Sequence, residues 1–529
     1  MQRNDLETVS VWQESTPGIP ADQQAREQCE VCVIGAGIAG LTTAYLLRRA
    51  GRDVQLIDAY GVGAGETGRT TAHLTAVLDD RFATLEKLFG AEGARIAADS
   101  HRAAIDLIER LVREEQIDCD FARVEGILFC TASEQKDLLE REAEAARKAG
   151  FEDLVETAAL SIPGFRFRGR ALRFPRQAMF HVGKYLHGLA RAFTARGGHI
   201  ETGVQAVAVK EGEIVHVKLD NGREIRARHV VVATNTPFVD RVKMHTKQAA
   251  YRTYVVGFPI AAGSFPACLL WDLEDPYHYV RIVRNVDGGE VLIVGGEDHK
   301  TGQDEVPARR FARLIEWARE HFPAVGDAKY RWSGQVMEPI DGLAFIGRNP
   351  GDDNIYVVTG DSGNGMTHGT LGAMLISDLI QGRDNPWTEL YDPARKTLQA
   401  VGSFVDENAN VLGHLVGDWI AGGKVKQRRE IPLGSGAIVR EGMSLLAVYR
   451  DNDGRFHELS AACTHLGCVV QWNDVERSWD CPCHGSRFAP ADGAVLNGPA
   501  AKPLERHDTH DAEAIPAQPL TAGTQVQTT

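Results

Sequence analysis

The chain has 529 residues, of which 43% are apolar and 25% are charged, and 54 of them are glycine. This composition excludes a disordered chain, a collagen and a small disulfide scaffold, and the length predicts two or three domains. The 58 basic residues against 72 acidic ones give a net charge of −14. A field of that sign repels phosphate backbones, so we expect no nucleic acid partner.

The sequence carries no recognisable signal for membrane insertion or export. Residues 1–20 lack a basic stretch followed by an apolar one. No run approaches the ~18 apolar residues that a membrane helix needs. We therefore expect no transmembrane segment and a cytoplasmic location.

A strand, a helix and a second strand are predicted between Glu30 and Asp58, after an N-terminal arm over residues 1–27. Residues 31–34 form a short apolar run, a glycine turn follows, and the helix extends through Ala50. A second apolar run then ends at Asp58. This order is typical of a βαβ unit.

Residues 92–330 predict mixed helices and strands. Two helices separated by a strand are predicted up to residue 149, and short alternating strands follow, interrupted by helices near 184–196 and 308–321. This pattern indicates α+β structure. A strand, a glycine-rich turn and a helix over residues 355–380 then resemble the opening unit.

The C-terminal part predicts a separate small module. A connector over residues 386–425 is predicted to be partly helical from an apolar stripe of Leu412, Leu415, Val416 and Trp419. Residues 426–506 have the short strands and frequent turns of an all-β module. We expect a flexible tail over residues 507–529.

Three glycines, Gly35, Gly37 and Gly40, stand where the first strand ends and the helix begins, as a dinucleotide site requires. The first allows the tight turn, the second lets the backbone approach a pyrophosphate, and the third permits close helix packing. Asp58 can accept hydrogen bonds from ribose hydroxyls. A fortuitous glycine turn is the alternative, and the pattern alone fits NAD as well as FAD.

Four segments resemble, in order and spacing, the D-amino acid oxidase-like FAD-dependent oxidoreductases: residues 65–74, 229–235, 334–347 and 360–369. The resemblance covers residues 28–385 and implies a Rossmann-like, glutathione reductase-type FAD-binding domain with an interleaved α+β substrate domain. It implies FAD-binding segments at 28–80, 165–240 and 331–385, and substrate-domain segments at 81–164 and 241–330. The family oxidises amines, amino acids and hydroxy acids.

The same resemblance implies which residues contact FAD. The glycine turn and Asp58 would hold the AMP end, and the flavin ring would lie at the N-terminus of a helix. That helix end would stabilise the negative charge that develops when a flavin is reduced. The remaining implied contacts are Thr67, Arg69 and Thr70 at the pyrophosphate, Val204 at the adenine, and Gly365, Met366 and Thr367 at the flavin ring.

Two loops near the C-terminus each offer one cysteine and one histidine: Cys463 with His465, and Cys481 with His484. This doubled set suits a two-iron cluster in which one iron takes both thiolates and the other takes both imidazoles. Structural zinc is the alternative, and it leaves the ordered doubling unexplained.

Residues 426–506 resemble the Rieske [2Fe-2S] domain, which implies that these four residues ligate the cluster. The resemblance also implies a disulfide between Cys468 and Cys483 and a loop over the cluster at residues 498–500.

One departure from the high-potential Rieske branch concerns hydrogen bonds to the cluster. Ser486 matches a donor to a cluster sulfur, but Phe488 stands where that branch has a tyrosine. The lost donor destabilises the reduced cluster. We therefore expect a reduction potential below that of the respiratory Rieske proteins.

A flavin accepts two electrons as a hydride and a [2Fe-2S] cluster accepts one, so their combination favours a dehydrogenase. We predict oxidation of a small amine or amino acid by FAD, with electrons passing through the cluster to an external one-electron acceptor. The alternative is a non-enzymatic or reductase-type electron-transfer protein in which the cluster feeds the flavin. A Rieske oxygenase does not fit, because too few residues follow His484 for its catalytic domain.

Candidate substrate-pocket residues lie on a predicted strand and in one loop. Tyr277, Tyr279 and Arg281 alternate, so they share a face, and in the family a sheet here covers the flavin. We take Tyr279 and Arg281 as candidate catalytic residues; an arginine there, or Arg252 in a similar set, would hold a substrate carboxylate. His73 is a candidate base, polar wall or covalent attachment point. The alternatives are an ordinary half-exposed strand face and a hydrogen-bonded structural histidine.

Overall fold

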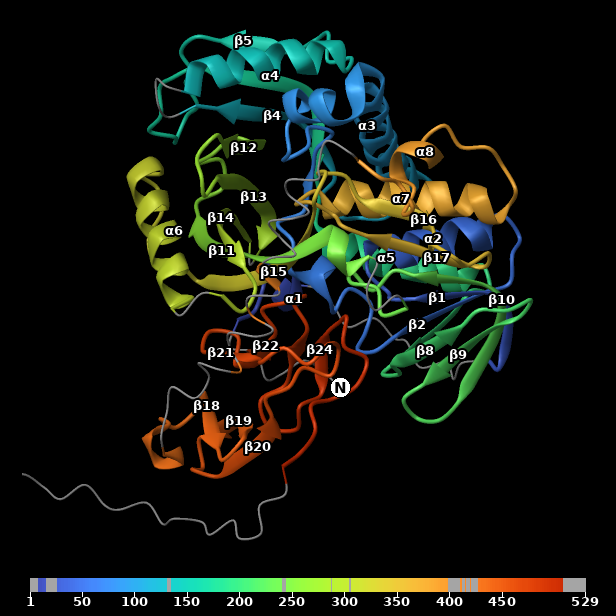
Figure 1. The fold of residues 1–529 in the computed structure, drawn as a ribbon. Coiled ribbons are helices and arrows are strands. Elements are labelled where there is room, and N and C mark those ends of the chain that lie inside the picture. Colours follow the sequence, from blue (N-terminus) through green and yellow to red (C-terminus); the bar gives the residue numbers. More distant parts are fainter. Residues whose placement is uncertain are drawn as a thin grey trace, which may run out of the picture.

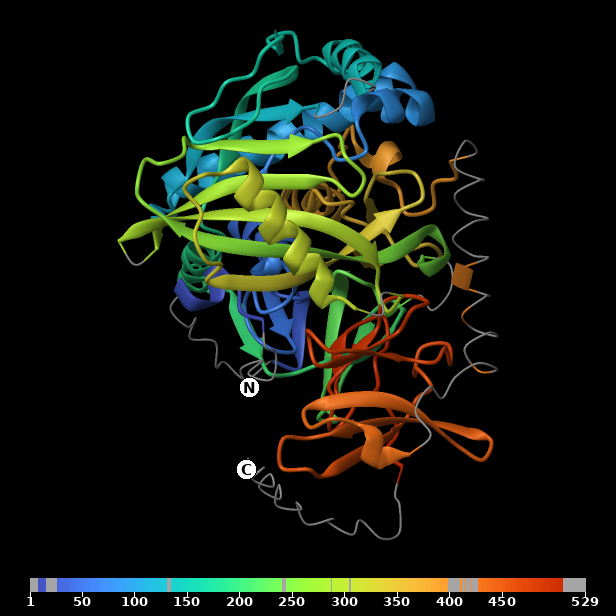
Figure 2. The ribbon, with the colours of Figure 1, turned by 90° about the vertical axis from the view of Figure 1, so that its left-hand side faces the viewer.

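The computed structural model describes residues 8–15, 26–130, 135–239, 244–286, 288–303, 306–397 and 427–507, together with 410, 411, 414 and 419. Two large α/β units pack together, and the C-terminal module lies against them (Figures 1 and 2). Of the predicted connector stripe, Leu412, Leu415 and Val416 lie outside the described residues, as does the predicted tail after His507.

The first sheet has eight strands in the order β16-β17-β10-β1-β2-β7, with the β8-β9 hairpin attached to β10. Its strands are β1 (Gln28–Ile34), β2 (Val54–Asp58), β7 (His199–Thr202), β8 (Ala206–Lys210), β9 (Val215–Leu219), β10 (Glu224–Val232), β16 (Phe345–Arg348) and β17 (Ile355–Thr359). The central strands are parallel and buried on both faces. This confirms the predicted βαβ opening.

Alternation along β1 explains how its two faces are covered. Val31 and Val33 pack in the core beneath the helices, whereas Cys32 and Ile34 pack in the core beside the β8-β9 hairpin. The helices on the first face are α2 (Ile38–Arg49), α5 (Val182–Ala195) and α7 (Gly365–Ile380), with α2 between the other two.

The second sheet has nine strands in the order β15-β11-β14-β13-β12-β4-β6-β3, with β5 paired to β6. The strands are β3 (His73–Leu74), β4 (Ala122–Phe129), β5 (Val155–Thr157), β6 (Ala171–Met179), β11 (Gln248–Ile260), β12 (Cys268–Asp272), β13 (His278–Val286), β14 (Gly289–Lys300) and β15 (Tyr330–Pro339). Helix α6 (Ala308–His321) packs on β11 and β14, and α3 (Phe82–Glu114) and α4 (Lys136–Lys148) pack together (Figure 1).

Sheet membership differs from the predicted segment boundaries. Strands β3, β6 and β15 belong to the second sheet, although residues 28–80, 165–240 and 331–385 were expected to build the FAD-binding domain. The reason is long-range pairing: β6 pairs with β4 and β15 pairs with β11. Local alternation predicts a strand but does not select its partner.

The C-terminal module is all-β, as predicted. One sheet contains β18 (Ser435–Glu441), β19 (Ser444–Arg450) and β20 (Phe456–Ser460), and the other contains β21 (Gln471–Asn473), β22 (Ser478–Asp480), β23 (Arg487–Phe488) and β24 (Val495–Asn497). The second of these sheets lies nearer the two large units (Figures 1 and 2).

Five short elements complete the described chain: α1 (Val11–Ser15), η1 (Glu66–Arg69), η3 (His245–Lys247), α8 (Thr388–Tyr391) and η5 (Arg428–Glu430). In α1, Val11 and Trp12 are buried, so this part of the N-terminal arm belongs to the core. Among the helices that the structure describes, none is both long and apolar enough to cross a membrane.

Candidate active site and metal centre

A cavity of about 300 Å³ opens between the two large sheets, at the carboxyl ends of β1, β2, β10 and β17. This edge is where open α/β sheets bind ligands. The cavity brings together most of the predicted site residues: Gly35, Gly37, Asp58, Thr67, Arg69, Thr70, Val204, Gly365, Met366, His73 and Tyr279.

The turn between β1 and α2 needs its glycines. Gly35 has a φ of 105°, and a Cβ there would lie 2.4 Å from the backbone oxygen of Ala233 at the end of β10. Gly40 lies beneath the turn, where a Cβ would lie 1.8 Å from the Gly35 oxygen. The turn therefore packs tightly against β10 and leaves its other side to the cavity.

We expect Gly40→Ala to abolish FAD retention, because the added methyl overlaps the Gly35 carbonyl and must displace the turn. The flavin absorbance per chain of the purified protein measures this. Gly326→Ala is the matched control, since a Cβ there meets nothing within 4 Å. A Gly40→Ala protein with the wild-type flavin content would contradict the assignment of the turn.

Asp58 ties the ends of two loops to the cavity edge. Its Oδ2 accepts a hydrogen bond from the Ala36 amide at 2.8 Å, and its Oδ1 accepts from the amides of Tyr60 at 2.8 Å and Gly61 at 2.9 Å. Asp58 also lines the cavity, where a carboxylate can accept hydrogen bonds from ribose hydroxyls. The aspartate thus positions the glycine turn as well as facing the predicted nucleotide.

The η1 segment presents donors suited to a pyrophosphate. Thr67 Oγ1 accepts from the Ile38 amide at 3.1 Å, which holds η1 over the N-terminus of α2. Arg69 is buried, and within the described chain its Nε and one terminal nitrogen make no hydrogen bond. Buried guanidinium donors without partners are costly unless an anion binds them. FAD therefore fits this end of the cavity.

The N-terminus of α7 differs in part from the implied flavin contacts. Gly365 and Met366 line the cavity, but the Thr367 side chain is 1% exposed and does not. Its Oγ1 pairs with His101 Nδ1 at 2.7 Å and donates to the Asn364 oxygen. Thr367 therefore fixes α7 to α3.

His73 and Tyr279 meet at the other end of the cavity, with ring centroids 5.6 Å apart. Thr71 Oγ1 lies 3.0 Å from His73 Nδ1, and Thr253 Oγ1 lies 2.6 Å from the Tyr279 hydroxyl. Burial and the nearby Arg281 lower the pKa of His73 to about 3. A neutral His73 is a polar wall and a weak base.

Neither candidate arginine is placed to hold a substrate carboxylate. Arg281 is 2% exposed, lies outside the cavity lining, and donates to the backbone oxygens of Thr71, Ala72 and Phe180. Arg252 donates to Ser333 at the contact with the C-terminal module. Both guanidiniums are buried and neither lines the cavity, so the expectation that either binds substrate is corrected.

Two carboxylates line the cavity, where we expected an arginine that binds a substrate carboxylate. Asp79 and Asp361 line the cavity, and Tyr277 donates to Asp79 Oδ2 at 3.3 Å. Burial and Asp80 raise the pKa of Asp79 to about 7, and burial raises the pKa of Asp361 to about 6. Sequence reasoning missed both, because acidic residues in loops are common. The only sequence signal for these two residues was their position in the chain. Asp79 follows shortly after Leu74, and Asp361 lies in the glycine-rich turn before α7.

The two cysteine-histidine loops lie side by side, between β20 and β21 and between β22 and β23. The rings of His465 and His484 are 5.0 Å apart, and a hydrogen bond with Cys481 lowers the pKa of the Cys463 thiol. Burial and His465 lower the pKa of His484 to about 4, which keeps it neutral. Its buried Nδ1 has no hydrogen bond partner within the described chain. A neutral imidazole nitrogen without a partner, beside two thiols, fits the expected iron ligands.

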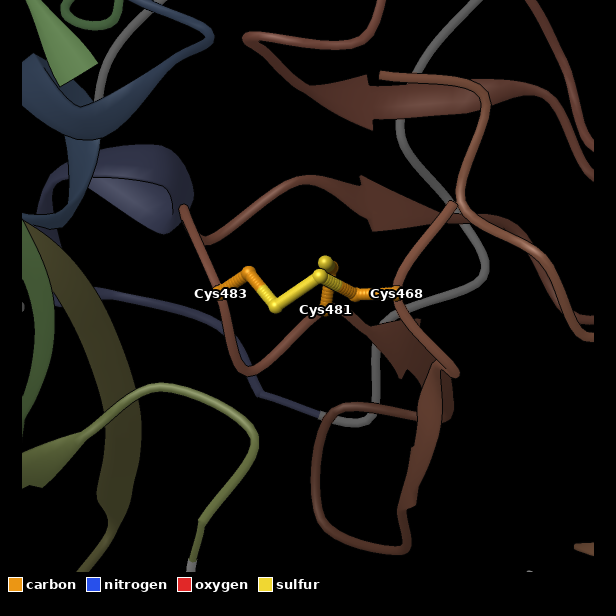
Figure 3. Close-up of side chains that lie close together, drawn as sticks. All are labelled: Cys468, Cys481 and Cys483. Carbon is orange, nitrogen blue, oxygen red and sulfur yellow. A yellow bond between two sulfur atoms is a disulfide. The ribbon is translucent and has the colours of Figure 1, made fainter. Parts of the chain in front are cut away.

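A disulfide joins Cys468 to Cys483, the pair that the resemblance implied. Figure 3 shows the Cys481 side chain beside this bridge, and the three sulfurs lie within 4.8 Å of one another. Ser486 Oγ accepts from the Ala500 amide at 3.1 Å, which connects the second loop to the segment after β24. The bridge ties the two cluster loops together.

Comparison with known families decides what the two sites hold. Residues 30–379 match the FAD dependent oxidoreductase family, and residues 423–508 match the Rieske [2Fe-2S] domain. The chain belongs to the FAD-dependent oxidoreductases. It is an FAD-dependent oxidoreductase fused to a Rieske domain, and its cofactors are FAD and a [2Fe-2S] cluster. The predicted family, the Rieske domain and both cofactors are confirmed.

A relative in Bacillus subtilis (strain 168), named as a Rieske 2Fe-2S iron-sulfur protein, YhfW, is 34% identical over 94% of this chain and 97% of its own length. The gamma-glutamylputrescine oxidoreductase of Escherichia coli (strain K12) is 26% identical over 67% of this chain and 84% of its own length. Among solved structures, glycine oxidase from Geobacillus kaustophilus superposes with a TM-score of 0.59 at 18% identity. It covers 70% of this chain and 100% of its own, which shows a shared fold.

Proposed function

We propose that this oxidoreductase oxidises a cationic amine at the carbon next to its nitrogen and delivers the electrons to an external one-electron acceptor through its own Rieske cluster. Bound FAD supplies a two-electron acceptor, and the cluster accepts one electron at a time. The observation that carries the proposal is the contact between the cluster loops and the FAD unit, residues 26–397.

His245 of the FAD unit packs against both cluster histidines, with ring centroids 4.9 Å from His465 and 5.8 Å from His484. A Cβ on Gly485, beside His484, would lie 2.8 Å from Gln335 Nε2, and Gln335 lines the FAD cavity. A single side chain thus separates the second cluster loop from the cavity. This proximity supports electron transfer between the cofactors within one chain.

The charge of the pocket supports an amine over an amino acid. Asp79 and Asp361 line the cavity, whereas Arg281 and Arg252 lie outside its lining. Carboxylates attract an ammonium group and repel the carboxylate of an amino acid. One relative is named for a putrescine derivative, which agrees with an amine substrate.

Asp79 is placed to act as the base. It lines the cavity and is exposed, and Tyr277 donates a hydrogen bond to its Oδ2 at 3.3 Å. An ammonium substrate must lose a proton before a hydride can leave its carbon. The hydride carries both electrons of the C–H bond to the bound flavin, and the substrate is left as an iminium. A carboxylate with a pKa of about 7 accepts that proton near neutral pH.

Anaerobic mixing of the holoenzyme with matched substrates tests this proposal. Putrescine and ornithine differ only by a carboxylate, as do propylamine and γ-aminobutyrate. We expect each amine to bleach the flavin at least about tenfold faster than its carboxylate partner, the effect of ~1.4 kcal/mol of repulsion. Faster bleaching by the carboxylate partners would contradict an amine substrate.

The reductase-type alternative has a different outcome. If the cluster feeds the flavin, no amine bleaches the flavin and a one-electron donor reduces it through the cluster. The cytoplasmic location, the absence of a nucleic acid partner and the external acceptor stay predictions.

A further inference from the structure

The Rieske domain, residues 427–507, supplies one wall of the FAD cavity. Six residues of the segment 495–501, which we call the roof segment, line the same cavity as Gly35 and Asp58: Val495, Leu496, Asn497, Gly498, Ala500 and Ala501. None of these side chains carries a charge, so the roof segment does not repel a pyrophosphate. The segment begins in β24, on the side of the domain that lies against the FAD unit (Figure 1).

The roof segment contacts three separate loops around the cavity. Asn497 Nδ2 donates to Glu66 Oε1 in η1 at 2.6 Å, and the Tyr60 hydroxyl, after β2, donates to the Val495 oxygen. A Cβ on Gly498 would lie 3.2 Å from the Thr236 oxygen after β10. These contacts span the mouth of the cavity from the pyrophosphate loop to the end of the parallel sheet.

A buried glutamate of the Rieske domain holds this arrangement in place. Glu476 is 0% exposed, and its Oε2 lies 3.1 Å from a terminal nitrogen of Arg69. Arg252 and Arg487 lie 3.6 Å from the same carboxylate, and Ser333 donates to it. Arg69 and Arg252 belong to the FAD unit, so the ion cluster crosses the interface.

The chemistry of this cluster favours the docked state. Burial alone would raise the pKa of Glu476, but the guanidiniums of Arg69, Arg252 and Arg487 hold it well below its usual range. Undocking would leave Arg69 and Arg252 without the carboxylate that neutralises them. Breaking a buried ion pair is strongly unfavourable because the remaining charge is uncompensated.

We propose that the Rieske domain completes the FAD site: the roof segment covers the bound dinucleotide, and Glu476 keeps the domain docked, so FAD enters and leaves only when the two units separate. This inference does not depend on the proposed substrate or on the direction of electron flow. It assigns FAD binding to residues of the iron-sulfur domain, and it makes Arg69 a link between the pyrophosphate loop and that domain.

The exchange of FAD by the full-length protein tests the proposal. The double variant Tyr60→Phe with Asn497→Ala removes two interface hydrogen bonds, and Asn452→Ala, at an exposed position of the same domain, is the control. Release is followed by the rise in free-flavin fluorescence after dilution, and uptake by its fall when apoprotein is mixed with FAD. We expect both rates to rise about tenfold in the double variant and to stay unchanged in the control.

A segment that covers bound FAD must slow both the uptake and the release of FAD. Faster release with unchanged uptake would make Asn497 an ordinary ligand contact and overturn the proposal, and so would unchanged rates in a double variant that retains its iron. Glu476→Gln should accelerate both rates further. That change leaves the buried guanidiniums of Arg69 and Arg252 without a carboxylate, whereas Arg487 keeps Asp480. Because the change can unfold the chain, the milder double variant decides if the glutamine variant does not fold.

Discussion

Replacement of His484 by alanine is expected to separate the two half-reactions. The change removes an iron ligand, but His484 does not line the FAD cavity, so a substrate still bleaches the flavin in one anaerobic turnover. Steady-state turnover with a one-electron acceptor falls at least about a hundredfold. Loss of a residue that only hydrogen-bonds to a metal ligand already lowers metal affinity or activity by up to that factor. Rapid-mixing absorbance measures the first step, and acceptor reduction measures the second.

The control is His457→Ala in the same domain. His457 bonds to Asp451 at 2.9 Å and stacks on Tyr449, away from the cluster, so both measurements should match the wild type. A His484→Ala protein that keeps FAD but is no longer bleached would show that electrons enter the flavin through the cluster. The proposed direction of flow would then be wrong.

Asp79→Asn is expected to lower kcat/KM for the amine by about a hundredfold, the usual lower range for loss of a general base. In the wild type, activity should rise as the pH increases through about 7, because the Asp79 carboxyl must ionise before it accepts the proton. The asparagine variant should lack this limb, and its activity should rise only where the free amine itself becomes deprotonated. A pH profile of kcat/KM gives both results.

Asp327→Asn is the matched control, because this carboxylate is exposed and, among the residues that the structure describes, its ion pair is with Arg319 at the surface. Its profile should follow the wild type. If Asp79→Asn retains the limb near pH 7, the base is a different carboxylate. Asp361 is then the candidate, since it lines the cavity and burial raises its pKa to about 6.

The parts of the site that the sequence predicted well are built from neighbours in the chain. The turn at Gly35 follows from a strand, three glycines and a helix in one short run, and the cavity lies over that turn. The disulfide between Cys468 and Cys483, which the resemblance to the Rieske domain implied, joins two loops of the same small module. Short-range sequence patterns of this kind can be interpreted before the three-dimensional fold is known.

The parts that the sequence missed depend on partners far along the chain. Arg281 alternates correctly with Tyr279, yet its guanidinium is bound by backbone oxygens of the loop at Thr71 and of Phe180. The contacts of Asp79 and Arg252 are likewise made by distant residues: Tyr277, just before β13, and Glu476 of the Rieske domain. No periodicity indicates such pairings, because they arise only when the sheets and the module meet.

The first described residues also bear on the order in which the protein matures. Thr8 donates to Glu476 at 2.8 Å, a pair separated by 468 positions, and Trp12 donates to the Thr70 oxygen. During synthesis Thr8 emerges 468 residues before Glu476. The FAD unit therefore cannot form this contact until the Rieske domain has been synthesised. A fragment that ends before the Rieske domain would leave Arg69 and Arg252 without the Glu476 carboxylate.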